Sequence, residues 1–163
     1  MARDTPSVSL DEALRLDALE RQRITDTPRD EAFDRIVRIA CAALEAPVGA
    51  ISFLESERLW VKAEQGVGLG ETDRDISFCT HALLGDEVMV VEDASRDPRF
   101  ASNPLVAEHG VRFYAGAPLT TTEGYRLGTL CVIDHIPRKI GQRDRNLLRD
   151  MAAIVVGELE LRR

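Results

Sequence analysis

Residues 48–65 read VGAISFLESERLWVKAEQ, and the two halves of this stretch have the composition of paired β-strands. Residues 48–54 form a short apolar run, which is typical of a strand buried on both faces. Residues 55–57 are polar and predict a turn. Along residues 58–65 the side chains alternate between two faces, with Leu59, Val61 and Ala63 on one and Trp60, Lys62 and Glu64 on the other. This stretch therefore predicts a β-hairpin.

A second hairpin and a set of helices surround the first. Residues 112–119 and 127–134 are again strand-like, and Glu123-Gly124 between them predicts a turn. Ser9 with Glu12 forms a capping box that predicts the start of a first helix. A second predicted helix, residues 31–44, places six apolar residues on one face: Phe33, Ile36, Val37, Ala40, Cys41 and Leu44. Together with a long helix from residue 142 to the end, this order predicts an α+β fold with an antiparallel sheet.

The segment between the hairpins is broken and rich in loops. Gly66, Gly68 and Gly70 predict a flexible loop, and Ser77 predicts the cap of a short helix through Leu84. A short strand follows at residues 88–91, and the chain is expected to break at Asn103-Pro104.

Size and charge exclude several classes of protein. The 163 residues fit one domain, expected at residues 10–162 after a short tail at 1–9. A net charge of −7 argues against nucleic acid or an anionic membrane as the main partner. No signal peptide or membrane-spanning run is present, and three widely spaced cysteines do not form a disulfide framework. We therefore expect a cytoplasmic protein in a reducing compartment.

Five short motifs occur along the chain in a fixed order: Glu31–Arg35, Ile76–Ala82, Asp97–Phe100, Arg112–Leu119 and Gly128–Asp134. Together they resemble bacterial GAF domains, in particular the sensor type at the amino end of sensor histidine kinases and diguanylate cyclases. The resemblance implies a central antiparallel sheet of about five or six strands, with terminal helices on one face and a ligand pocket under the loop-rich segment on the other. It also implies a dimer of terminal helices that passes a signal to an output protein.

The candidate ligand site combines aromatic walls with a few polar groups. All aromatic residues except Phe33 lie within residues 53–125, which favours a pocket there. The residues expected to bind a ligand are Phe53, Trp60, Phe78, Cys79, His81, Arg112, Tyr114 and Cys131. Arg112 is the candidate for an anionic group, because a guanidinium binds carboxylate or phosphate with two parallel hydrogen bonds. No cofactor is expected, and the ligand is an unidentified small molecule.

Two alternatives to ligand sensing stay open. The first is a thiol-based redox sensor or reductase that uses Cys79 and Cys131, although the cysteine pattern differs from GAF reductases and from bilin-binding photoreceptors of the phytochrome kind. The second is a structural dimerisation module without a ligand. In either case, an apolar stripe on Leu148, Val155 and Leu159 is expected to form a homodimer interface. No spacing typical of a metal site and no catalytic motif occurs, so the chain itself is not expected to be an enzyme.

Overall fold

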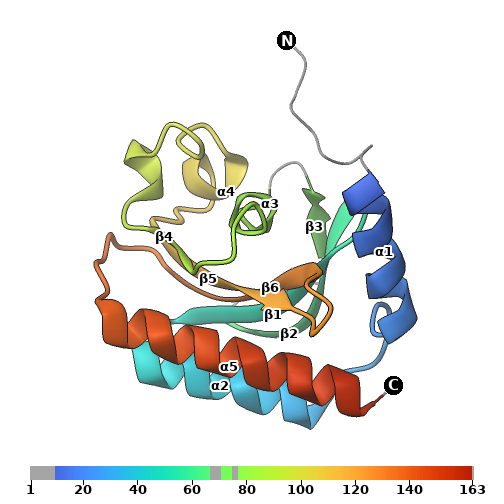
Figure 1. The fold of residues 1–163 in the computed structure, drawn as a ribbon. Coiled ribbons are helices and arrows are strands. Elements are labelled where there is room, and N and C mark those ends of the chain that lie inside the picture. The colour runs from blue at the N-terminus through green and yellow to red at the C-terminus, as the bar shows by residue number, and fades with distance from the viewer. Residues whose placement is uncertain (1–9, 67–70, 75–76, 163) are drawn as a thin grey trace.

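The computed structural model describes residues 10–66, 71–74 and 77–162, which form a sheet covered on both faces (Figure 1). The helices are α1 (Leu10–Gln22), α2 (Glu31–Leu44), α3 (Cys79–Ala82), α4 (Pro104–Ala107) and α5 (Gln142–Leu161), with a 3-10 helix at Ala94–Arg96. The strands are β1 (Val48–Leu54), β2 (Arg58–Gln65), β3 (Glu71–Asp73), β4 (Met89–Val91), β5 (Phe113–Thr120) and β6 (Arg126–Asp134). The expected tail 1–9 with its capping Ser9, the glycine-rich residues 67–70, and Ile76 lie outside the described residues.

The two predicted hairpins lie next to each other in the sheet, whose strand order is β3-β2-β1-β6-β5-β4. Every pairing of neighbouring strands is antiparallel. At the centre, β1 pairs with β6 from Val48↔Ile133 to Phe53↔Gly128. Hairpins from opposite halves of the chain are thus joined by their inner strands, and the expected α+β class with an antiparallel sheet is confirmed.

Helices α2 and α5 lie side by side against one face of the sheet (Figure 1). The six apolar residues predicted to share a face of α2 are all buried there. The buried residues of α5 are Leu148, Met151, Ala152, Val155, Val156 and Leu159. They pack in one core with sheet residues that include Ile51, Phe53, Trp60, Phe113, Leu130 and Val132. This core is the larger of the two hydrophobic cores that the described residues form.

The dimer interface expected on α5 is corrected by this packing. Leu148, Val155 and Leu159 are only 0%, 0% and 3% exposed. They point into the sheet-facing core, because residues seven and eleven apart return to the same side of a helix. Ile154 faces outward instead and is 59% exposed.

Helix α1 lies beside the sheet and is anchored by buried charged groups (Figure 1). Arg15 forms two hydrogen bonds with the carboxylate of Glu12, 2.9 and 3.0 Å long, and donates a third of 2.7 Å to the carbonyl oxygen of Leu54. Arg74 reaches the same carboxylate at 2.9 Å. Because Glu12 and Arg15 are both buried, this network ties α1 to the end of β1.

A β-bulge on β2 changes which side chains share a face. Val61 pairs with Ser52 and Ala63 with Ile51, so Lys62 is the extra residue between the two pairs. The strict alternation expected along residues 58–65 therefore holds through Lys62 and is wrong from Ala63 onward. Ala63 lies in the helix-side core, and Glu64 lies on the opposite face.

The second face of the sheet is covered by α3, α4 and the 3-10 helix, which are short and joined by loops (Figure 1). Phe78 stacks on Phe100 with ring centroids 4.2 Å apart, and a tilted contact of 5.1 Å joins Phe78 to Tyr114 of β5. The side chain of Asn103 accepts a hydrogen bond from the amide of Leu105, so Asn103-Pro104 begins α4 and is not the break expected from the sequence.

The close approach of β1 and β6 gives a stability prediction. A Cβ atom at Gly128 would lie 1.8 Å from the backbone oxygen of Ser52, and a backbone atom cannot rotate away. We expect Gly128→Ala to destabilise the fold by about 3 kcal/mol or more, measured by urea denaturation.

Gly157→Ala is the matched control, because a Cβ atom on this exposed position of α5 meets nothing within 4 Å. It should stabilise the protein by about 0.5–1 kcal/mol, since alanine has the higher helix propensity. Equal unfolding midpoints for the two variants would contradict the close approach of β1 and β6 at Gly128.

Candidate functional site

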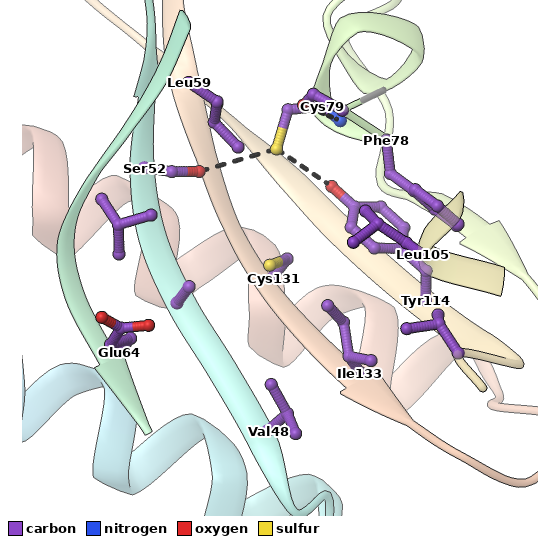
Figure 2. Close-up of a pocket in the computed structure, with 14 residues that line it drawn as sticks. Val48, Ser52, Leu59, Glu64, Phe78, Cys79, Leu105, Tyr114, Cys131 and Ile133 are labelled. Carbon is purple, nitrogen blue, oxygen red and sulfur yellow. Dashed lines mark hydrogen bonds between the residues drawn. The ribbon is translucent and has the colours of Figure 1, made fainter. Parts of the chain in front are cut away.

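A cavity of about 70 Å³ lies between the sheet and its cover of short helices (Figure 2). Its floor comes from three strands, β1, β6 and β5, and one side comes from β2. The segment 77–79, with Leu105 and Val111, closes it from above. The lining residues are Val48, Ala50, Ser52, Leu59, Val61, Glu64, Ser77, Phe78, Cys79, Leu105, Val111, Tyr114, Cys131 and Ile133. Most of this lining is aliphatic or aromatic, so the cavity suits a small and largely apolar molecule.

One end of the cavity holds a buried cluster of hydroxyl groups around a thiol. The Sγ atom of Cys79 lies 3.5 Å from the phenol oxygen of Tyr114 and 3.6 Å from the Oγ of Ser52 (Figure 2). It also lies 2.8 Å from the Oγ1 of Thr129. All four side chains are at most 3% exposed. The backbone amide of Cys79 donates a 3.0 Å hydrogen bond to the Oγ of Ser77, which fixes the first turn of α3 over the sheet.

The sheet register builds this cluster. Ser52 and Thr129 are direct partners in the β1–β6 pairing, so their side chains emerge together on the cavity face. Tyr114 reaches the same point because its ring extends along β5 over Gly116, where a Cβ atom would lie 2.3 Å from the phenol oxygen. A glycine at this position of β5 therefore makes room for the hydroxyl group that contacts Cys79.

The cluster provides hydrogen bonds in a site from which water is largely excluded. Burial raises the pKa of the Tyr114 phenol well above its usual value, so this group stays protonated and can donate. Burial likewise raises the pKa of the Cys131 thiol, with the neighbouring Cys79 adding to the effect. The arrangement can hold a hydroxyl, carbonyl or amide group of a bound molecule, or donate hydrogen bonds to the sulfur of Cys79.

The structure brings four of the eight expected ligand residues to this cavity: Phe78, Cys79, Tyr114 and Cys131. Phe53 and Trp60 do not line it. They are partners across β1 and β2, and both point into the core under α2 and α5. Aromatic character alone could not assign them to a face of the sheet.

Two polar residues expected at the site lie outside the cavity lining. Arg112 donates hydrogen bonds from Nη1 to the carbonyl oxygens of Val106 and Val111, at 3.1 and 3.0 Å, and thereby holds the turn that follows α4. His81 packs edge-on against Phe100 with ring centroids 4.9 Å apart. Burial lowers the pKa of His81, with a smaller contribution from Arg99, so the ring is held neutral.

Several residues of the cavity and of its hydroxyl cluster were not expected from the sequence. Ser52 and Thr129 are the clearest cases, because each is a small polar residue inside an otherwise apolar strand. Such buried hydroxyl groups need partners, and that requirement is a signal that sequence reasoning can use. Glu64 was missed for another reason, since only the bulge at Lys62 places it on the cavity face.

Two further searches cover only the described part of the chain. Within residues 10–66, 71–74 and 77–162, no group of three or more His, Cys, Asp or Glu side chains could hold a metal ion. In the same ranges no helix is both long and apolar enough to cross a membrane.

Comparison with known proteins gives one family. Residues 28–159 match the GAF domain family. The chain is 40% identical over 157 residues to the cyclic di-GMP phosphodiesterase PA2567 of Pseudomonas aeruginosa, and the match covers 95% of this chain. It spans only 27% of that relative's length.

Solved structures agree on the fold. The GAF domain of an Acinetobacter phosphoenolpyruvate-protein phosphotransferase superposes with a TM-score of 0.69 at 22% identity, over 91% of this chain and 93% of that one. Free methionine-R-sulfoxide reductase from Neisseria meningitidis superposes with a TM-score of 0.66 at 16% identity, over 98% of this chain and 96% of that one. With this sheet, these covering helices and these motifs, the chain belongs to the GAF domain family, a family of signalling sensor domains.

Proposed function

We propose that this domain senses a small molecule that binds in the cavity beneath α3 and α4, and that it regulates an output protein without catalysing a reaction itself. The observation that carries the proposal is the cavity with a buried hydrogen-bonding cluster at one end and apolar walls elsewhere. Because the polar groups lie at one end of the cavity, a ligand would bind in one orientation, with the ligand's own polar end at Cys79 and Tyr114.

The cavity size limits the ligand class. One buried water molecule needs roughly 10–15 Å³ of cavity volume. This cavity of about 70 Å³ therefore accommodates a molecule of only a few non-hydrogen atoms. A larger ligand would have to displace the short helices of the cover. These helices are held by few contacts compared with α2 and α5, and such regions open at low free-energy cost.

A signal can pass from the cavity to the long helices through a single layer of backbone. Val48 and Ala50 of β1 line the cavity, whereas Gly49 between them faces α2. A Cβ atom at Gly49 would lie 2.6 Å from the sulfur of Cys41, so β1 and α2 are already in closest contact. A ligand that moves β1 must therefore move α2 as well, because packed interiors do not absorb small shifts.

The proposal that this domain regulates an activity outside itself rests on the relative from Pseudomonas aeruginosa as well as on this chain. The cyclic di-GMP phosphodiesterase of Pseudomonas aeruginosa matches this chain over about a quarter of its length. We propose that the corresponding part of that relative, like this chain, regulates an activity located elsewhere. A cytoplasmic location is part of this proposal, because the chain's charge and cysteines suit that compartment.

A ligand screen by thermal shift and native mass spectrometry tests the cavity. A ligand at a hundredfold excess over its Kd should stabilise the protein by about 2.7 kcal/mol, which raises Tm by roughly 5–10 °C for a domain of this size. Ala50→Met should abolish the shift, because the longer side chain fills the cavity. Ala107→Met adds the same atoms to an exposed position of α4 and should retain it. Binding that survives in both variants would place the site elsewhere.

A redox function is the second candidate, and it is favoured by the position of two thiols. Cys79 and Cys131 line the same cavity, and the hydroxyl groups of Thr129, Tyr114 and Ser52 can donate to a Cys79 thiolate. A peroxide would oxidise Cys79 to a sulfenic acid with release of water, and the Cys131 thiol would then form a disulfide with release of a second water. Cys131 is two residues, about 7 Å, along β6 from Thr129, so closing this bond requires α3 to move.

Intact-mass measurement after mild peroxide treatment distinguishes the candidates. The redox candidate predicts a loss of two hydrogens that Cys131→Ser abolishes. Cys41→Ser is the control and should leave the change intact, because Cys41 lies in the helix-side core and burial raises its pKa. An unchanged mass under these conditions would leave ligand sensing as the proposed function.

We also propose that the domain forms a homodimer through the outer faces of α2 and α5. Ile39 and Ile154 are 51% and 59% exposed there, beside a groove of about 300 Å³ lined by residues of both helices. Charged residues are exposed on the same two helices: Arg35 and Arg38 pair with Glu31 on α2, and Arg149 and Asp150 lie on α5. A two-fold axis would pack α2 of one copy against α5 of the other, with Ile39 and Ile154 at an apolar centre and charged residues around it.

Ile39→Glu with Ile154→Glu should give a folded monomer, because four carboxylates would meet at the centre of the dimer. Leu84→Glu is the control, since Leu84 is 67% exposed on the cover side of the sheet and should leave the dimer unchanged. Sedimentation velocity with circular dichroism measures both properties. A monomeric wild-type protein at tens of micromolar would contradict the proposal.

A further inference from the structure

A second pocket, of about 300 Å³, lies on the helix side of the sheet and is lined by charged residues. It forms where the end of α1, the loop between α1 and α2, strand β2 and the last turn of α5 meet. Its lining residues are Gln22, Arg23, Ile24, Thr27, Pro28, Arg29, Asp30, Lys62, Leu159 and Arg162. Four of the ten are cations and one is a carboxylate, in a protein whose net charge is −7. The pocket is therefore an exception to the acidic character of the chain.

Lys62 is the buried cation of this pocket. Its side chain is only 5% exposed, because Lys62 lies on the same face of β2 as Trp60, toward the helices. The ammonium group donates to the Oγ1 of Thr27 at 2.8 Å and to the carbonyl oxygen of Pro28. Both partners are neutral, and no carboxylate of the described residues forms a salt bridge with Lys62. A buried ammonium without a counter-ion is unfavourable, and an anion in the pocket would relieve that cost.

Lys62 and a second cation, Arg162, both lie against the aromatic ring of Phe33. The Nζ of Lys62 lies 5.6 Å from the centroid of Phe33, and the guanidinium carbon of Arg162 lies 5.0 Å from it. Burial lowers the pKa of Lys62, and the positive charge of Arg162 lowers it further, against the opposing effect of Asp30 and Asp34. Two like charges are thus held against one ring by the fold.

The neighbouring carboxylates are already engaged. Asp30 accepts hydrogen bonds from both terminal nitrogens of Arg162 and from the amide of Ala32, where it caps α2. Asp34 pairs with Arg29 at 3.1 Å, and Glu158 pairs with Arg162 at 2.8 Å. Lys62 and the exposed Arg23 are the two cations of the pocket that lack a carboxylate within 4 Å among the described residues. A small anion would supply the missing charge.

We propose that this pocket binds a phosphate group, either as inorganic phosphate or as a small phosphate ester. Lys62 provides a fixed positive charge at the floor, and the exposed Arg23 at the rim provides a guanidinium group whose paired N–H bonds match phosphate oxygens. The bound group would link the α1–α2 loop to β2 and to the end of α5. This site is separate from the cavity beneath α3 and α4 and does not depend on a ligand there.

Isothermal titration of the full chain with sodium phosphate tests the proposal, with sodium chloride at the same ionic strength as the reference. We expect saturable binding of phosphate and none of chloride. Lys62→Met should weaken binding by about tenfold or more, and it should fold, because methionine replaces the buried ammonium with an apolar group of similar length. Lys139→Met makes the same change at an exposed lysine and should leave Kd within about twofold.

Arg23→Gln is a second variant at an exposed position and should weaken binding by about threefold or more without affecting the fold. Glycerol 3-phosphate in a parallel titration distinguishes the two sources: tighter binding than inorganic phosphate identifies an ester as the ligand, and weaker binding identifies the free ion. The proposal is overturned if phosphate at about 10 mM releases no more heat than chloride. It is also overturned if Lys62→Met and Arg23→Gln both bind phosphate as tightly as the wild type.

Discussion

The pairing of β1 with β6 is the contact on which the rest of this structure depends. It joins two hairpins from opposite halves of the chain, and the backbones approach so closely at Gly128 that no side chain fits there. The same register places Ser52 beside Thr129 on one face. It also places Ile51 beside Leu130 on the other face, under the long helices. A slip of one residue would exchange the two faces and destroy both the helix-side core and the polar end of the cavity.

The two faces of the sheet differ because their covers differ in length. Helices of 14 and 20 residues, α2 and α5, present continuous apolar stripes and leave a filled core. Helices of only four residues cover the other face, and they are fixed locally by capping at Asn103 and by the stacked rings of Phe78 and Phe100. Short elements cannot interdigitate along a whole sheet, so space remains above Ala50 and Cys131. The cavity is thus a consequence of how this face is covered, and binding sites commonly arise in such places.

Local pattern in the sequence was enough to predict the long helices, the two hairpins and the α+β class, but not β3, α4 or the facing of every side chain. The spacing of apolar residues placed α2 correctly, since helical period and burial agree there. The same reasoning assigned Leu148, Val155 and Leu159 to a dimer, because it could not tell how wide a stripe the sheet itself would bury. Phe53 and Trp60 were expected at the cavity and lie on the opposite face. The pattern of residues along β2 does not reveal the bulge at Lys62. This bulge places Glu64 on the cavity face of the sheet.

Strand β2 also places residues of the two proposed sites next to each other in the chain. Val61 lines the cavity on one face of β2, and Lys62, the next residue, forms the floor of the basic pocket on the other. A bulge is held by fewer ladder hydrogen bonds than a regular strand, so its backbone can adjust more easily than its neighbours. A ligand that presses on Val61 would therefore change the position of the Lys62 ammonium relative to Arg162. Because coupling between two binding sites is reciprocal, a phosphate group held by Lys62 would change the affinity of the cavity by the same factor. Since Leu159 and Arg162 line the basic pocket, the end of α5 lies directly beside this point of coupling.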